Sequence, residues 1–245
     1  MPSLSVPNQL VWFAHCPKTG GTSIEQFMVE NWGDAVGHLH WGWDIWWRNG
    51  GWRKASPPNS PQHLTWSDAQ PELPRSPDVV FTIVRDPIAR MVSEYGYQRY
   101  HRRSTWLGRN LARIPFSLWL RILLKVREMN AYAFDNHLRP QADFVPENAR
   151  IFRLEEGLDL VGTWLAGTCG LEGPQCIGRK LHTAHKPGVI LSDQDKSLIF
   201  KYFKDDFARF SYPAPEAPPH RLGALDVIAS LLAFPVFVLE RCGQL

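Results

Sequence analysis

The segment from Cys16 to Ser23, CPKTGGTS, places a lysine, two glycines and three hydroxyl residues directly after an apolar run. Glycines allow the backbone to approach an anion closely, and a helix that begins at Thr22 or Ser23 would point backbone amides at it. Lys18 would add positive charge, and hydroxyl groups would add hydrogen-bond donors. The residues expected to bind a phosphate-like group are Lys18, Thr19, Gly20, Gly21, Thr22 and Ser23.

The order of these residues separates the segment from a Walker A loop, in which the lysine follows the last glycine. Here Lys18 precedes both Gly20 and Gly21. The plainer alternative is a tight glycine turn before a capped helix, which needs no ligand. Because a lysine and three hydroxyl residues coincide after a strand, we favour an anion-binding loop.

A second polar segment, RDPIARMVS, runs from Arg85 to Ser93 and follows the apolar run at 79–84. Arg85 would lie at the carboxyl end of a buried strand, where α/β proteins bind ligands. A guanidinium matches phosphate oxygens, and the Ser93 hydroxyl can complete the contact. Taken alone, the segment could equally be a capped helix with surface arginines.

In this order, the two motifs resemble the nucleotide-binding motifs of the sulfotransferase superfamily, with similarity to its carbohydrate and bacterial members. The resemblance implies 3′-phosphoadenosine 5′-phosphosulfate (PAPS) as sulfuryl donor and 3′-phosphoadenosine 5′-phosphate (PAP) as product. It implies that Lys18 contacts the bridging oxygen and the 5′-phosphate, while Arg85 and Ser93 hold the 3′-phosphate. Lys186 lies where the family often has a loop that closes over the cofactor, although a solvated basic loop is the alternative.

Sulfuryl transfer relies on in-line positioning and electrostatics, and the chemistry requires no metal. Lys18 would stabilise charge on the leaving oxygen, and a general base would accept the acceptor's proton. We choose His63 as this base, because its placement before the second motif resembles that of the base in heparan sulfate 2-O-sulfotransferases. An ordinary surface histidine is the alternative. The other residues considered for this role are His15, His38, His40, His137, Glu25 and Asp68.

The acceptor is expected to be a hydroxyl group on a carbohydrate or glycoconjugate, mainly because of the resemblance. Six tryptophans crowd the segment 32–52. Their rings could stack on a sugar or could equally fill a hydrophobic core. Tyrosine, lipid and small-alcohol acceptors stay open. Two other functional classes stay open: a nucleotide-binding module without turnover, and a P-loop-like nucleotide kinase. The kinase is disfavoured because this sequence does not have the Walker A order of residues.

Apolar runs at 10–15 and 79–84 predict buried strands, and a third strand is expected at 149–154; these strands alternate with helices. Helices are expected at 22–31, 88–100, 158–166 and 193–203, with two more between 107 and 133 on either side of Pro115. This alternation predicts an α/β fold: a single P-loop-like domain with a central, mainly parallel sheet flanked by helices. The domain should cover residues 1–212, and 213–245 should form a proline-rich linker and an apolar helix.

The composition fits an ordinary globular chain of 245 residues. A net charge of +3 suits an anionic cofactor and is too small to indicate nucleic acid as a partner. The N-terminus lacks the features of a secretory signal, so we expect a cytoplasmic protein with free thiols, although Cys169 and Cys176 are close enough to bridge. Segment 222–239 contains Asp226 and Pro235, which favours a docking or interfacial helix in peripheral membrane contact over a membrane span.

Overall fold

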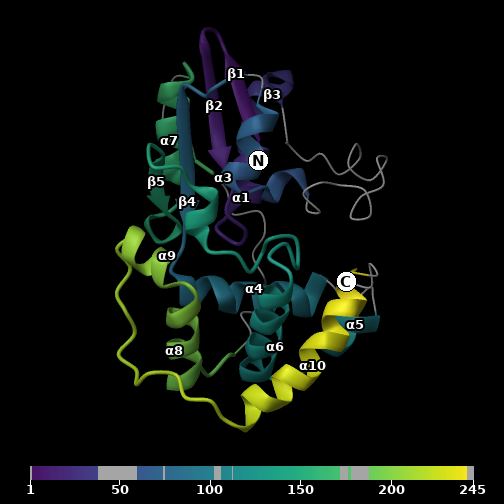
Figure 1. Cartoon of the computed structure of the whole chain (residues 1–245). Coiled ribbons are helices and arrows are strands. Elements are labelled where there is room, and N and C mark those ends of the chain that lie inside the picture. The colour runs from purple at the N-terminus through teal and green to yellow at the C-terminus, as the bar shows by residue number, and fades with distance from the viewer. Residues whose placement is uncertain are drawn as a thin grey trace. The chain divides into compact units, whose positions relative to one another are not determined.

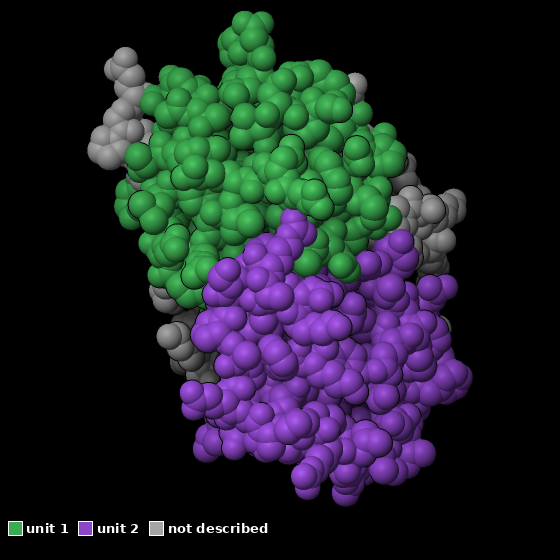
Figure 2. All heavy atoms as spheres, turned by 60° about the vertical axis from the view of Figure 1, so that its left-hand side comes forward, with its two compact units in different colours: residues 1–85, 141–182 green, residues 86–140, 183–245 purple. Residues whose placement is uncertain are grey.

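The computed structural model describes residues 2–37, 60–73, 75–101, 106–111, 113–171, 176–177 and 188–241. The chain forms two compact units, which Figure 2 colours separately. Unit 1 comprises Met1–Arg85 and Gln141–His182, and unit 2 comprises Asp86–Pro140 and Thr183–Leu245. A domain boundary at residue 212 stays a prediction.

Unit 1 is built on a five-stranded sheet with the strand order β3-β1-β2-β4-β5 (Figure 1). The centre is parallel, because β2 (Gln9–Ala14) pairs with β4 (Val79–Val84), and β4 pairs with β5 (Arg150–Arg153). Two strands that the sequence pattern did not indicate, β1 (Ser3–Val6) and β3 (Val36–Gly37), extend the sheet in antiparallel fashion. The predicted α/β class with a parallel centre is confirmed.

Both faces of β2 and β4 are buried, which explains why these strands are apolar at nearly every position. Phe13 of β2 stacks on Phe81 of β4, with ring centroids 4.9 Å apart. The surrounding cluster includes apolar side chains of the helices α1 (Gly21–Trp32) and α7 (Asp159–Thr168). Trp12 points to the opposite face, where its ring lies 5.5 Å from that of Trp66. Helices therefore cover the two faces of the sheet.

The helical elements of unit 1 follow the strands closely. The helices are α1 (Gly21–Trp32), α3 (Trp66–Ala69) and α7 (Asp159–Thr168). The 3₁₀ turns are η1 (Gly33–Ala35), η3 (Pro61–His63), η4 (Gln70–Glu72), η5 (Gln141–Phe144) and η6 (Leu154–Glu156). In the described part of the chain, Cys16, Cys169 and Cys176 are free thiols.

Unit 2 is helical in the part that the structure describes. Its helices are α4 (Pro87–His101), α5 (Trp106–Leu111), α6 (Phe116–Met129), α8 (Asp193–Tyr202), α9 (Lys204–Arg209) and α10 (Ala224–Arg241). Pro115 is the residue before α6, which confirms the predicted break between two helices. In Figure 1, α10 runs beside α6, against which it packs.

A buried carboxylate, Asp195, connects the helices of unit 2. It forms a capping box with Ser192 at the start of α8. Its Oδ1 lies 2.6 Å from Nη1 of Arg121, and its Oδ2 accepts a hydrogen bond from Ser117 at 2.6 Å. Burial raises the pKa of Asp195, but the hydrogen bonds from Ser117, Arg121 and Ser192 together lower it by more. The pKa therefore lies below 3.8. The carboxylate is therefore held ionised between α6 and α8.

Candidate active site in the loop between β2 and α1

The CPKTGGTS loop connects the carboxyl end of β2 to the first turn of α1. Its backbone turns sharply, because Lys18 and Gly20 adopt left-handed φ values of 68° and 93°. No side chain caps α1, so its first-turn amides are the natural hydrogen-bond donors for an anion. The buried Thr19 hydroxyl donates to the carbonyl of Cys16 at 2.8 Å, which leaves its backbone amide as the donor it can offer.

The ring of His15 explains why residue 21 must be glycine. A Cβ atom on residue 21 would lie 1.9 Å from Nε2 of His15, closer than any real contact. On the other side of the ring, Nδ1 of His15 lies 2.8 Å from Oε1 of Glu25, and both residues are buried. Burial raises the pKa of Glu25, but the attraction and hydrogen bond of His15 lower it more, so it lies below 4.5. The buried pair of His15 and Glu25 thus packs against the loop and supports it.

His63, the predicted base, is buried at the end of η3 in the same unit as the loop. Its ring meets the ring of His15 edge-on, with centroids 5.2 Å apart, and its Nδ1 lies 3.4 Å from Oγ of Ser60. His15 in turn contacts Gly21, so only the ring of His15 lies between His63 and the loop. The long sequence separation between these histidines hides this proximity from pattern analysis.

Arg85 follows the carboxyl end of β4 and reaches the same loop. Its Nη1 donates to the carbonyl of Lys18 at 3.4 Å. Its backbone is held by the buried side chain of Gln141: the Arg85 N–H donates to Oε1 at 2.8 Å, and Nε2 donates to the Arg85 carbonyl at 2.9 Å. Sequence reasoning missed this role of Gln141. Unit 1 therefore brings Lys18 and Arg85 together.

Ser93, the predicted partner of Arg85, is half-buried in α4 and belongs to unit 2. The next residue, Glu94, is buried, and its Oε2 lies 2.6 Å from Nδ1 of His137. The buried guanidinium of Arg90 donates to the carbonyls of His137 and Arg139 at 3.1 and 2.7 Å. The second motif thus supplies a structural arginine as well as the two residues that the sequence indicated.

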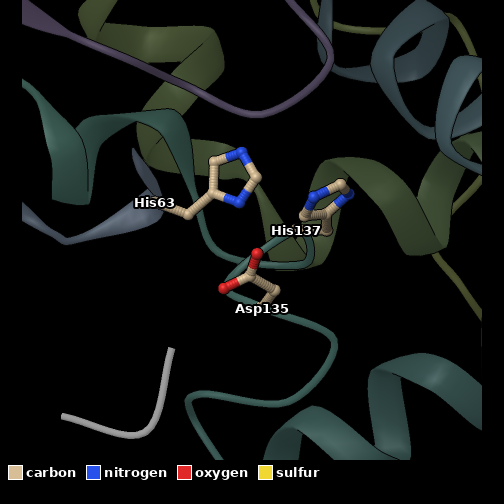
Figure 3. A group of neighbouring side chains, drawn as sticks. All are labelled: His63, Asp135 and His137. Atoms are coloured by element: carbon tan, nitrogen blue, oxygen red, sulfur yellow. The ribbon is translucent and has the colours of Figure 1, made fainter. Parts of the chain in front are cut away.

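Three adjacent buried residues before His137 adopt left-handed backbone conformations: Phe134, Asp135 and Asn136, with φ between 55° and 60°. Such conformations are costly for residues with side chains, and the Arg90 hydrogen bonds hold the segment in place. Figure 3 labels Asp135 and His137 from this segment together with His63. His63 belongs to unit 1, whereas Asp135 and His137 belong to unit 2.

Several predicted residues lie outside the described part of the chain. They are Lys186, His38, His40 and the tryptophans between Trp41 and Trp52. Trp32 is described: it ends α1, and its ring lies 5.7 Å from that of Phe27. That tryptophan packs against its own helix.

A comparison with known protein families identifies the family of this chain. A family model described as "Sulfotransferase family" matches residues 4–155, more than half of the chain. The match spans the loop, His63, Arg85 and Ser93, and it ends before the helices α7 to α10. The searches of curated proteins and of solved structures found no significant match.

Proposed function

We propose, from the premise that this chain belongs to the sulfotransferase family, that it transfers a sulfuryl group from PAPS to a hydroxyl group on a carbohydrate or glycoconjugate. Sulfuryl transfer follows from the family. The donor and the acceptor are the parts that we propose, together with the residues that bind them.

The observation that carries the choice of donor is the contact between Arg85 and the loop. The guanidinium donates to the carbonyl of Lys18 at 3.4 Å, while the loop presents the uncapped first turn of α1. Two kinds of group that can bind phosphate, a guanidinium and the amides of a helix start, therefore lie at one end of the parallel strands. PAPS needs both kinds, because it carries a 5′-phosphosulfate and a separate 3′-phosphate. We assign the loop to the former and Arg85, with Ser93, to the latter.

In the proposed reaction, the acceptor oxygen forms a bond to sulfur while the bond from sulfur to the bridging oxygen breaks. Lys18 stabilises the negative charge that develops on the bridging oxygen, and the α1 amides hold the adjoining phosphate. His63 accepts the proton of the attacking hydroxyl group. The products are a sulfate ester, PAP and a proton on the base.

Support for His63 as the base comes from its place beside His15. The edge-on contact holds the His63 ring near the loop, and Ser60 lies within 3.4 Å of its Nδ1. The Ser60 hydroxyl can therefore help to orient the His63 ring, and an imidazole of this kind is suited to accept a proton near neutral pH. Among the alternatives, Glu25 is already engaged by His15, and Asp68 accepts a hydrogen bond from Thr65 at 2.7 Å.

The test is to incubate the full chain with radiolabelled PAPS and a panel of glycans, tyrosine peptides, lipids and simple alcohols. Label transfer to a glycan, with equimolar release of PAP, is the expected result. Transfer only to another acceptor would retain the reaction and replace the glycan. Binding of PAP without any transfer would favour a nucleotide-binding module, and phosphoryl transfer from ATP would favour a kinase. Lys18→Ala serves as the inactive control.

A further inference from the structure

Helix α10 exposes a continuous apolar surface. Leu231 is 72% exposed, and Val227 and Phe234 are each 63% exposed. The other exposed apolar residues of the helix include Leu225, Ile228, Leu232 and Val238. Surfaces of this kind on soluble proteins usually mark an interaction site.

The apolar residues of α10 that pack on the rest of unit 2 include the partly buried Phe237 and Leu239. Ala229, Ala233 and Val236 are buried, and the helix packs against α6. At about 100° per residue, the exposed apolar side chains from Phe234 round to Leu225 cover roughly half of the helix circumference. A helix that packs on one partner needs an apolar stripe only about 100° wide. The exposed surface of α10 is therefore wider than one partner helix would cover.

Charge is arranged around this surface in a way that suits an anionic plane. No charged residue occurs between Asp226 and Glu240. Both of these carboxylates contact unit 2 itself: Asp226 lies 3.4 Å from Nε of Arg121, and Glu240 accepts a hydrogen bond from the N–H of Phe134 at 3.1 Å. Arg221, just before the helix, and Arg241, at its end, are exposed. The apolar surface is thus flanked by exposed cations, while its acids face the protein.

We propose that α10 lies flat on an anionic lipid bilayer, with its exposed apolar side chains among the acyl chains and Arg221 and Arg241 at the phosphate headgroups. A bilayer covers a wide apolar arc that a single helix would leave partly exposed, and lipid phosphates complement the flanking arginines. In the described residues no helix is long and apolar enough to cross a membrane, so the proposed contact lies at the interface. This inference is independent of the proposed reaction.

The test is co-sedimentation of the full chain with vesicles of phosphatidylcholine alone or mixed with phosphatidylglycerol. We expect binding to the mixed vesicles, weakened by salt and much weaker with phosphatidylcholine alone. The double variant Leu231→Glu/Phe234→Glu should lower the partition coefficient by about tenfold or more, because two apolar side chains leave the acyl region. Arg221→Glu/Arg241→Glu should remove the preference for anionic vesicles.

Ile190→Glu is the matched control, because Ile190 is 94% exposed in unit 2 and lies outside α10. It should bind vesicles as the wild type does. Circular dichroism and thermal unfolding establish that each variant is folded. Absence of wild-type binding, or equal loss in the Ile190→Glu control, would overturn the proposal. It would also be overturned if sedimentation velocity showed a dimer that Leu231→Glu/Phe234→Glu dissociates, since a second copy would then cover the surface.

Discussion

The imidazole of His15 occupies the space that a Cβ atom on residue 21 would need, with Nε2 1.9 Å from that position. The second glycine of the loop is therefore required by the protein's own packing. A loop that is fixed from below by a buried His15–Glu25 pair can present its amides in one arrangement before a ligand arrives.

Gly21→Ala should destabilise the protein by about 1–3 kcal/mol and weaken PAP binding, because the methyl group forces His15 or the loop to move. Urea denaturation and calorimetry measure the two effects. Gly167→Ala in α7 is the matched control, since a Cβ there meets no atom within 4 Å, and it should be tolerated. If Gly21→Ala binds PAP and unfolds as the wild type does, the packing argument is wrong.

Lys18→Ala should lower kcat by about a hundredfold or more while weakening PAP binding much less, because its charge matters most as the bridging oxygen leaves. Steady-state kinetics and calorimetry with PAP separate the two effects. Lys18→Gly controls for the backbone, since Lys18 has a φ of 68° that glycine adopts without strain. Recovery of turnover in the glycine variant would show that the backbone, and not the ammonium group, is what matters.

Arg85→Ala should weaken PAP binding by roughly 2 kcal/mol, or about thirtyfold, because it removes the charged hydrogen bond that we propose to the 3′-phosphate. Its affinity for adenosine 5′-phosphate, which lacks that phosphate, should change little. Ser93→Ala should show the same selectivity with a smaller loss. An equal loss of affinity for both nucleotides in the Arg85 variant would argue against a 3′-phosphate contact.

His63→Ala should lower kcat by about a hundred- to ten-thousandfold and remove the fall in rate at low pH that protonation of an imidazole base causes. His137→Ala is the contrasting variant, because His137 pairs with buried Glu94 in unit 2 at 2.6 Å. It should lower thermal stability and leave the shape of the pH profile unchanged. The reverse pattern would transfer the role of base to His137.

Asp195→Asn should lower the free energy of unfolding by about 3 kcal/mol at neutral pH, because it breaks a buried ion pair with Arg121. The folded-state pKa of Asp195 is depressed, so its contribution is present above the unfolded pKa and is lost as pH falls through the folded value. The difference between variant and wild type should therefore shrink below about pH 4. Asp193→Asn, which affects an exposed pair with Lys196, should have almost no effect.

The sequence predicted the central elements well, because their signals are local. The apolar run at 79–84 coincides with β4, and Pro115 marks the start of α6. The antiparallel strands β1 and β3 escaped prediction. β3 has two residues, too few for a period-two pattern. β1 forms a hairpin with β2, and the turn contains Asn8 with a left-handed φ of 64°; because this turn lacks the glycine that usually marks a hairpin, the sequence carries no signal for it.

In the candidate site, too, some features follow from the local sequence and others only from the fold. The loop and Arg85 could be found from their residue types, since a phosphate site has few chemical solutions. The pair of His15 with Glu25, the neighbouring ring of His63 and the clamp formed by Gln141 depend on contacts between distant segments. No local pattern carries that information: the resemblance alone indicates His63, and its place beside His15 depends on the fold.

Gln141 also has a topological consequence. Arg85 is the last residue of unit 1 before segment 86–140 of unit 2, and Gln141 is the first residue after that segment. The side chain of Gln141 bonds both the N–H and the carbonyl of Arg85, so the points of exit and return lie side by side within unit 1. Segment 86–140, one of the two segments that make up unit 2, therefore leaves and rejoins unit 1 at adjacent points, as segments inserted into domains commonly do. Unit 1 could in this way accept a different segment between Arg85 and Gln141 without changing its sheet.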